Sequence, residues 1–263
     1  MRRLIAEIKR RDRVLFYTGC FNLAVLVLLM AVAPFDSRIV NGLNPAIKPM
    51  KFAISIAIYC WTIAWLLDDA GGPGWLRSLI RWGVSVAMVF EILPITLQAM
   101  RGTTSHYNSA TGFDAAMFYL MGAMILGNTL LVLVLFGRYL GRVALPSPYA
   151  WGVRIGLAIF LLGSIEGLAM IFRSAHTVGL TDRSPGLWFV NWSTRAGDLR
   201  IAHAAGLHAL QTLPLVGFAL SRWPSGLAVS ARTTLVVAFG LAYGAFGMAL
   251  FAQAMRGEPL VRF

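Results

Sequence analysis

Charged residues are scarce in this sequence. Only 13% of its 263 residues are Asp, Glu, Lys or Arg, whereas 58% are hydrophobic. A soluble domain has roughly a quarter of its residues charged and about half apolar. A soluble fold of this length could not bury so much apolar surface, so we expect lipid to be the main solvent for the exterior. The shortage of charge therefore excludes the soluble classes of protein.

Cysteines and acidic residues are also few. Cys20 and Cys60 both lie in apolar runs and form no CxxC pair, which excludes a zinc finger and a disulfide framework. The 11 acidic residues face 23 basic ones, for a formal charge of +12. No recognition-helix or basic aromatic pattern accompanies this charge, so we predict no nucleic-acid partner. Basic residues at membrane borders, in contact with membrane lipid, account for it better.

Long apolar runs dominate what is present. A membrane span needs about 20 mostly apolar residues, and Gly or Pro residues punctuate the connections between such runs. Seven runs qualify and predict an all-α, polytopic bundle of seven transmembrane helices: Val14–Ala33, Ile47–Leu67, Leu79–Met100, Phe113–Phe136, Tyr149–Phe172, Leu199–Leu220 and Thr233–Met255. No internal repeat or soluble segment is visible, so residues 1–263 are predicted to form one seven-helix domain, with 1–13 as a basic cytoplasmic tail.

The first run also resembles a signal peptide. Basic residues precede it, and it ends in the small-residue sequence Ala31-Val32-Ala33. However, the run is as long as a full span, and Pro34 directly after the candidate cleavage site is a poor context for cleavage. We therefore expect a retained first helix.

The distribution of Lys and Arg predicts the orientation. The segment before the first span is strongly basic, whereas its far flank has only Asp36 and Arg38 nearby. Positive flanks stay in the cytoplasm, and the first helix usually dominates this choice. We expect a cytoplasmic N-terminus and, after seven spans, a C-terminus outside.

Two acidic residues lie well inside predicted spans, where each costs several kcal/mol, about 2.5 to 3.5 on insertion scales. Glu91 shares a helix face with Gln98, and Glu166 shares one with Arg173, because residues seven apart fall on the same side of a helix. Arg101 follows the third span directly. Buried acids of this kind mark either ligand sites or structural partners inside the bundle.

The four histidines fall on the same predicted side of the membrane as these groups. His106 and His176 follow the third and fifth spans, and His203 and His208 lie in the sixth. Five residues of helix separate the last two by about 140°, with Gln211 between them in projection. They would therefore face different neighbours or line a wide arc of a cavity.

This asymmetry predicts a polar cavity in the outer half of the bundle. Its candidate ligand-binding residues are Glu91, Gln98, Arg101, Glu166, Arg173 and Gln211. Its candidate metal ligands are His106, His176, His203 and His208. The alternative is a network of polar contacts that only holds the helices together.

One stretch carries a resemblance. Gly197-Asp198-Leu199-Arg200-Ile201-Ala202-His203, followed by Gly206-Leu207-His208-Ala209-Leu210-Gln211, resembles a motif in a group of uncharacterised bacterial multi-pass proteins. The resemblance implies a protein of the bacterial inner membrane and supplies no activity.

Three functions remain open. The first is a site for a transition metal, haem or small ligand, with or without catalysis, because imidazoles beside carboxylates suit such ligands. The second is a proton-coupled transporter or ligand-sensing bundle that uses the acids and histidines as protonatable groups. The third is a structural or assembly subunit. The sequence does not decide whether the protein is an enzyme.

Overall fold

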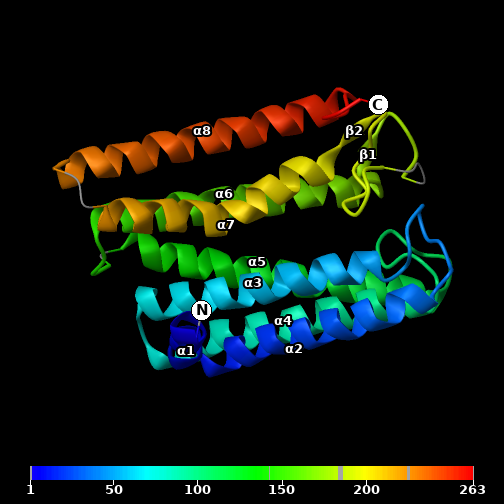
Figure 1. Cartoon of the computed structure of the whole chain (residues 1–263), viewed down its shortest axis with the longest axis horizontal. Coiled ribbons are helices and arrows are strands. Elements are labelled where there is room, and N and C mark those ends of the chain that lie inside the picture. The colour runs from blue at the N-terminus through cyan, green and yellow to red at the C-terminus, as the bar shows by residue number, and fades with distance from the viewer. Residues whose placement is uncertain (1, 142, 183–185, 224–225, 263) are drawn as a thin grey trace. The chain divides into compact units, whose positions relative to one another are not determined.

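The computed structural model describes the whole chain except residues 1, 142, 183–185, 224–225 and 263 (Figure 1). Its elements are α1 (Arg2–Arg11), α2 (Arg13–Val32), the short 3-10 helix η1 (Ala33–Phe35), α3 (Ile47–Ala70), α4 (Gly74–Met100), α5 (Gly112–Leu140), α6 (Ser147–Arg173), β1 (Thr177–Val178), β2 (Gly197–Asp198), α7 (Leu199–Arg222) and α8 (Val229–Met255). Within the described residues, seven helices are long and apolar enough to cross a membrane. The prediction of an all-α, seven-helix membrane protein is confirmed.

Each predicted span overlaps one of these helices, and several ends coincide. Helices α3 and α7 begin at Ile47 and Leu199 as predicted, and α4 and α8 end at Met100 and Met255. Helices α3 and α5 run about a turn past the C-terminal end of their predicted spans, to Ala70 and Leu140, because backbone hydrogen bonding continues until a breaker stops it. Gly71, with a φ of 58°, is such a breaker at the end of α3.

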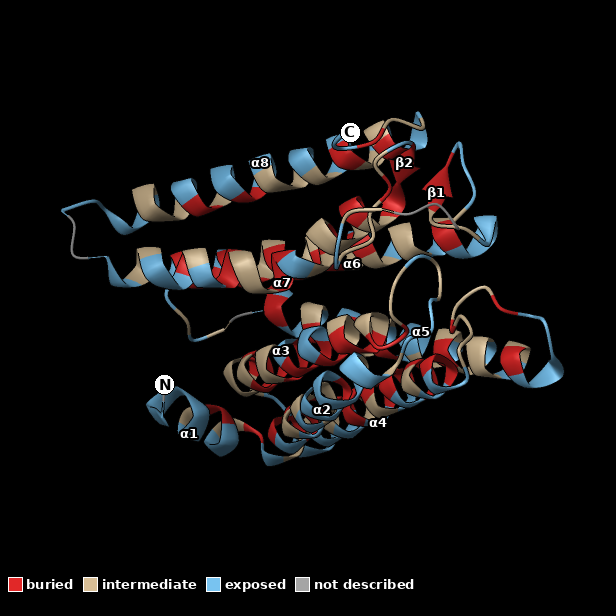
Figure 2. Ribbon diagram, turned by 45° about the vertical axis from the view of Figure 1, so that its right-hand side comes forward, coloured by how far each residue is buried: buried red, intermediate tan, exposed pale blue. Residues whose placement is uncertain are grey.

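The chain forms two compact units, residues 1–131 and 132–263, and α5 runs from the first into the second. The single domain predicted for residues 1–263 stays a prediction. In the first unit, α2, α3 and α4 pack against one another around fully buried side chains such as Leu15, Ile63 and Ile92. Many large apolar residues of these helices, such as Val27 and Leu28, are exposed, as expected where lipid is the solvent. Figure 2 shows exposed and buried residues alternating along the helices.

The basic segment before the first span is helical, which was not predicted. Helix α1 ends at Arg11, and Asp12 has an extended backbone with φ −152° and ψ 109°. The chain therefore changes direction there, and α1 does not continue the line of α2 (Figures 1 and 2). The Asp12 carboxylate then accepts a hydrogen bond from the backbone N–H of Leu15 and caps α2.

The second unit is built on a close crossing of α6 and α7. A Cβ added to Gly163 would lie 2.8 Å from the Cα of Gly206, so the two backbones touch where neither residue has a side chain. Helix α8 packs against both helices. The connection from α6 to α7 contains a short antiparallel pair, β1 and β2, in which Thr177 faces Asp198. These strands were not predicted.

Candidate functional site

The sequence placed Glu91 in the middle of a span with no identified partner. In the structure, His106 returns from the α4–α5 loop, and its Nε2 lies 3.8 Å from the Glu91 Oε1. The other imidazole nitrogen, Nδ1, lies 3.3 Å from the Nζ of Lys48 in the first turn of α3 and 3.0 Å from the Ser105 Oγ. We call Lys48, Glu91, Ser105 and His106 the His106 cluster. It joins α3, α4 and the loop.

Burial makes this cluster unusual. Glu91 is 4% exposed, and its second carboxyl oxygen, Oε2, accepts no hydrogen bond from the described residues. A buried polar atom without a partner carries a desolvation cost of about 1 to 3 kcal/mol. Such atoms in a folded protein call for an explanation, and a functional role is one.

Aromatic rings surround the imidazole. The ring centroids of Phe52, Tyr107 and Phe118 lie 5.9, 6.1 and 6.3 Å from that of His106. Tyr107 adopts a left-handed backbone, with φ 54°, which a side chain rarely adopts without local compensation. The rings lower the local dielectric, so interactions among the Lys48, Glu91 and His106 side chains are stronger than they would be in water.

Gln98 and Arg101, two of the predicted ligand-binding residues, share Asp114 as a partner. The Gln98 Nε2 donates to the Asp114 Oδ1 at 2.8 Å, and Arg101 contacts both side chains. The Asp114 Oδ2 accepts from the Thr111 hydroxyl at 2.7 Å, and the Asp114 N–H donates back to the Thr111 Oγ1. These contacts tie the end of α4 to the first turn of α5. Asp114 was not among the predicted site residues, although Thr111-x-x-Asp114 has the spacing of a helix capping box.

In the second unit, His203 faces its neighbouring helix. Its Nδ1 lies 2.7 Å from the carbonyl oxygen of Gly163 on α6, and its ring packs beside Gly167. His208, five residues further on, is exposed. The two side chains have different surroundings, as the 140° separation predicted. His203 contacts α6, whereas His208 is exposed.

The remaining predicted groups of the second unit are dispersed. His176 pairs with Asp182 in the α6–α7 loop, with 3.2 Å between Nδ1 and Oδ1. Arg173 is exposed and Glu166 is half-buried, and the Glu166 Oε2 accepts no hydrogen bond from any residue that the structure describes. Gln211 is half-buried on α7. The His176–Asp182 pair fixes the loop, but the described residues of this unit do not bring the predicted groups together in one site.

The described part of the chain holds no group of three or more His, Cys, Asp or Glu side chains placed to bind a metal. The structure places His106 with one carboxylate, His176 with one, His203 against a backbone carbonyl, and His208 at an exposed position. Metal or haem binding by these four histidines stays a prediction that no side-chain grouping supports.

The His106 cluster lines neither the groove on the first unit nor the small hollow on the second that are formed by the described residues. A groove of about 370 Å³ runs along α4 and α5 in the first unit, lined by side chains that include Trp82, Val86 and Met124. A hollow of about 10 Å³, large enough for roughly one water molecule, lies beside Asp198 and Ile201 in the second unit. The groove is apolar apart from Asn128. The Asn128 Oδ1 accepts a hydrogen bond from the Tyr59 hydroxyl at 2.8 Å.

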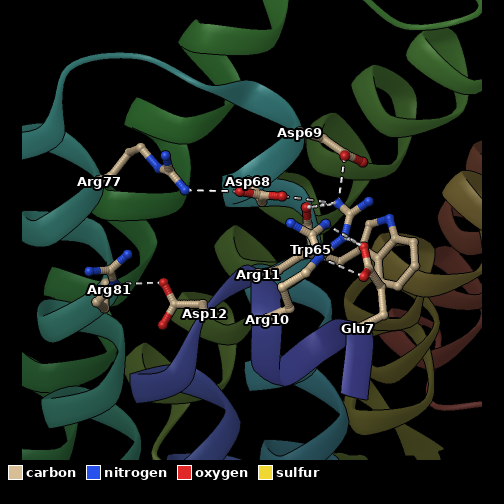
Figure 3. A network of polar contacts seen from close by, with 9 residues as sticks. All are labelled: Glu7, Arg10, Arg11, Asp12, Trp65, Asp68, Asp69, Arg77 and Arg81. Carbon is tan, nitrogen blue, oxygen red and sulfur yellow. Dashed lines mark hydrogen bonds and ion pairs between the residues drawn. The ribbon is translucent and has the colours of Figure 1, made fainter. Parts of the chain in front are cut away.

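A second polar group lies where the first unit begins, and we call it the Arg11 network (Figure 3). The Arg11 guanidinium donates to Asp69 at 2.6 Å and to Glu7 at 2.9 Å, and it stacks on the Trp65 ring at 3.9 Å from the centroid. The network also holds Arg10 paired with Glu7, Arg77 paired with Asp68, and Arg81 paired with Asp12. Hydrogen bonds from Arg10 and then Arg11 lower the pKa of the Glu7 carboxyl to about 2.

The Arg11 network was not predicted. Its signal in the sequence was the acidic pair Asp68-Asp69, which lies on the same predicted side of the membrane as the basic N-terminal segment. The network fixes α1 to the end of α3, and it fixes Asp12 and the end of α3 to the beginning of α4.

Comparisons of the chain with protein-family models, with curated proteins and with solved structures find no match.

Proposed function

We propose that this membrane protein carries a proton-linked site for a small anion, formed by the His106 cluster, and that it belongs to the proton-coupled transporter or ligand-sensing class. The observation that carries the proposal is the buried Glu91 carboxyl, which lies 3.8 Å from the His106 imidazole with one oxygen unpartnered. A carboxyl and an imidazole at this separation can each hold the proton that the other releases.

The charges of the cluster favour an anion as the ligand. Lys48 is a fixed cation 3.3 Å from His106, and a protonated imidazole would add a second positive charge. An ionised Glu91 repels an anion at the same place, whereas a protonated Glu91 does not and can donate a hydrogen bond. Anion and proton are therefore expected to bind together, because a buried charge without compensation costs several kcal/mol.

A metal or haem site has less support. Glu91 and His106 are two ligands, and a third of suitable type would be required for most protein metal sites. A purely structural role remains the competing explanation of the cluster. It predicts that replacing Glu91 changes stability and that no anion stabilises the protein.

The proposed location is the bacterial inner membrane, with the N-terminus in the cytoplasm and the His106 cluster toward the outside. The support is the basic segment Arg2–Arg13 before the first span, since positively charged flanks stay cytoplasmic. On this topology the cluster lies on the side from which a periplasmic solute or ligand would arrive.

The test is a melting screen of the purified full-length protein against small carboxylates and inorganic phosphate at pH 6 and pH 8. A stabilising anion should act more strongly at pH 6, and its addition to weakly buffered protein should take up protons from solution, read by a pH-sensitive dye. Glu91→Gln and His106→Gln should lose the pH dependence and the proton uptake. Glu166→Gln removes an acid from a span of the second unit and should behave as wild type.

Two results would contradict the proposal. One is an anion that binds the wild type without proton uptake at either pH. The other is the same proton uptake in Glu91→Gln as in the wild type, since the cluster would then not hold the proton.

A further inference from the structure

The N-terminal helix α1 and the first residue of α2 carry positive charges that do not take part in the Arg11 network. Four acids and four arginines pair within that network: Glu7, Asp12, Asp68 and Asp69 with Arg10, Arg11, Arg77 and Arg81. The network is therefore neutral as a whole. The surplus positive charge at this end of the first unit lies on other residues.

Those residues are Arg2, Arg3, Lys9 and Arg13. All four are exposed, and within the described chain the side chains of Arg2, Arg3 and Arg13 make no ion pair or hydrogen bond. Lys9 contacts the faces of Phe16 and Tyr17, with its Nζ 5.3 Å from the Tyr17 centroid. Glu7, the one acidic residue in Arg2–Arg11, is paired with Arg10 and Arg11. Helix α1 therefore has no other acid to neutralise these four charges.

The same helix exposes apolar side chains next to these charges. Leu4 and Ile5 are 54% and 40% exposed, while Ile8, on the same face one turn later, is buried. Helix α1 ends directly before the first span, and its direction is set by the extended Asp12 and by the Arg11 contacts with Asp69 and Trp65. A short amphipathic helix held beside a span, with unpaired cations and exposed leucine and isoleucine, has the composition of a helix that lies in the headgroup region.

We infer that α1, together with Arg13 at the start of α2, is a docking surface for anionic phospholipid. Arg2, Arg3, Lys9 and Arg13 contact headgroup phosphates, and Leu4 and Ile5 enter the acyl boundary. The four cations and an anionic leaflet are complementary in charge, and each basic residue near such a surface contributes on the order of 1 kcal/mol, or roughly fivefold in affinity. The Arg11 network supports this role because it fixes the helix without using these charges. The inference does not depend on the function proposed for the His106 cluster.

The test is native mass spectrometry of the full-length protein taken from mixed phosphatidylglycerol and phosphatidylcholine. Wild type should retain phosphatidylglycerol preferentially, and the preference should fall as NaCl is raised, because salt screens exposed charges. The variant R2Q/R3Q/K9Q/R13Q should lose roughly tenfold or more of the preference. Leu4→Ser with Ile5→Ser should lower total lipid retention while keeping the preference for the anionic lipid.

Two further variants control the test. R138Q/R195Q/R222Q/R262Q removes four exposed arginines from the second unit and should keep the wild-type ratio. R2K/R3K/R13K keeps every charge at the surface and should also keep it, which guards against a glutamine variant that inserts in the wrong orientation. Equal retention of both lipids by the wild type would overturn the inference, and so would equal losses in the first-unit and second-unit glutamine variants.

Discussion

The imidazole of His203 occupies the space beside Gly167, and its Nδ1 lies 2.7 Å from the carbonyl oxygen of Gly163, one helix turn away on α6. A polar side chain inside a membrane bundle thus finds its partner in the backbone of the neighbouring helix. This arrangement requires α6 and α7 to approach closely, which the glycines at the crossing permit.

The first prediction concerns stability at the α6–α7 crossing. Gly163→Ala should destabilise the protein by about 1 to 3 kcal/mol, because the added methyl would lie 2.8 Å from the Gly206 Cα and backbone must move. Gly247→Ala on α8 is the matched control, since its Cβ would meet nothing within 4 Å. Unfolding by denaturing detergent measures both. Equal midpoints for the two variants would contradict the close approach.

The second prediction concerns how the stability of the protein depends on pH through Asp198. Burial alone would raise the pKa of this carboxyl, but hydrogen bonds from Arg200 and Ser193, with the charge of Arg200, hold it below the ordinary value. A folded pKa below the unfolded one means that its contribution is present above about pH 4 and is lost as pH falls below that value. Wild type should therefore lose stability on acidification below about pH 4.

Asp198→Asn should flatten that part of the stability curve, because asparagine does not titrate while its side-chain oxygen can still cap α7. Glu258→Gln, at an exposed ion pair with Arg256, is the control and should leave the slope as in the wild type. Melting temperatures at pH 3, 4, 5 and 7 supply the measurement. A slope unchanged in Asp198→Asn would show that other groups cause the acid sensitivity.

The third prediction concerns Asp12, which both caps α2 and pairs with Arg81. Its Oδ1 accepts from the Leu15 N–H at 3.0 Å, and its Oδ2 pairs with the Arg81 Nε at 2.6 Å. Asp12→Asn keeps the cap and loses the charge pair, whereas Asp12→Ala loses both, so the alanine variant should be less stable by about a further 1 kcal/mol. Asp36→Ala, at an exposed pair with Arg38, should cost less than either. Chemical unfolding in detergent ranks the three, and any other order counts against the double role.

The fourth prediction concerns the orientation of the chain in the membrane. A reporter that is active only in the cytoplasm should work when fused after Leu145, between α5 and α6, and fail at the C-terminus, because an odd number of spans places the termini on opposite sides. A reporter active only outside should give the reverse pattern. Activity of the cytoplasmic reporter at the C-terminus would refute the proposed topology.

The spans could be predicted from sequence because each depends on local hydrophobicity alone. The run Ile47–Leu67 needs no knowledge of its neighbours to qualify as a span, and its helix begins at Ile47 as expected. Helix α1 was missed for a related reason: Arg2–Arg11 is too polar to qualify as a span, and its helix is fixed by Asp69 and Trp65, residues far along the chain.

The site was harder to predict because side-chain partners are set by packing. Helical spacing correctly placed Glu91 and Gln98 on buried positions of one face, but their partners, His106 and Asp114, come from a loop and from the next helix. Spacing also separated His203 from His208, yet it could not tell which of them faces a neighbour. Only the position of α6, through the Gly163 carbonyl, decides that.

The Asp12–Arg81 pair also carries information about the order of assembly. Its partners are 69 residues apart, and a ribosome adds about 5 to 20 residues per second. Asp12 is therefore made several seconds, roughly 3 to 14, before the arginine that neutralises it. During that interval its carboxylate must stay in water at the membrane border, and the pair closes only when the third span arrives. Closure of this pair would thus report, in a nascent chain, the moment at which α4 joins α2.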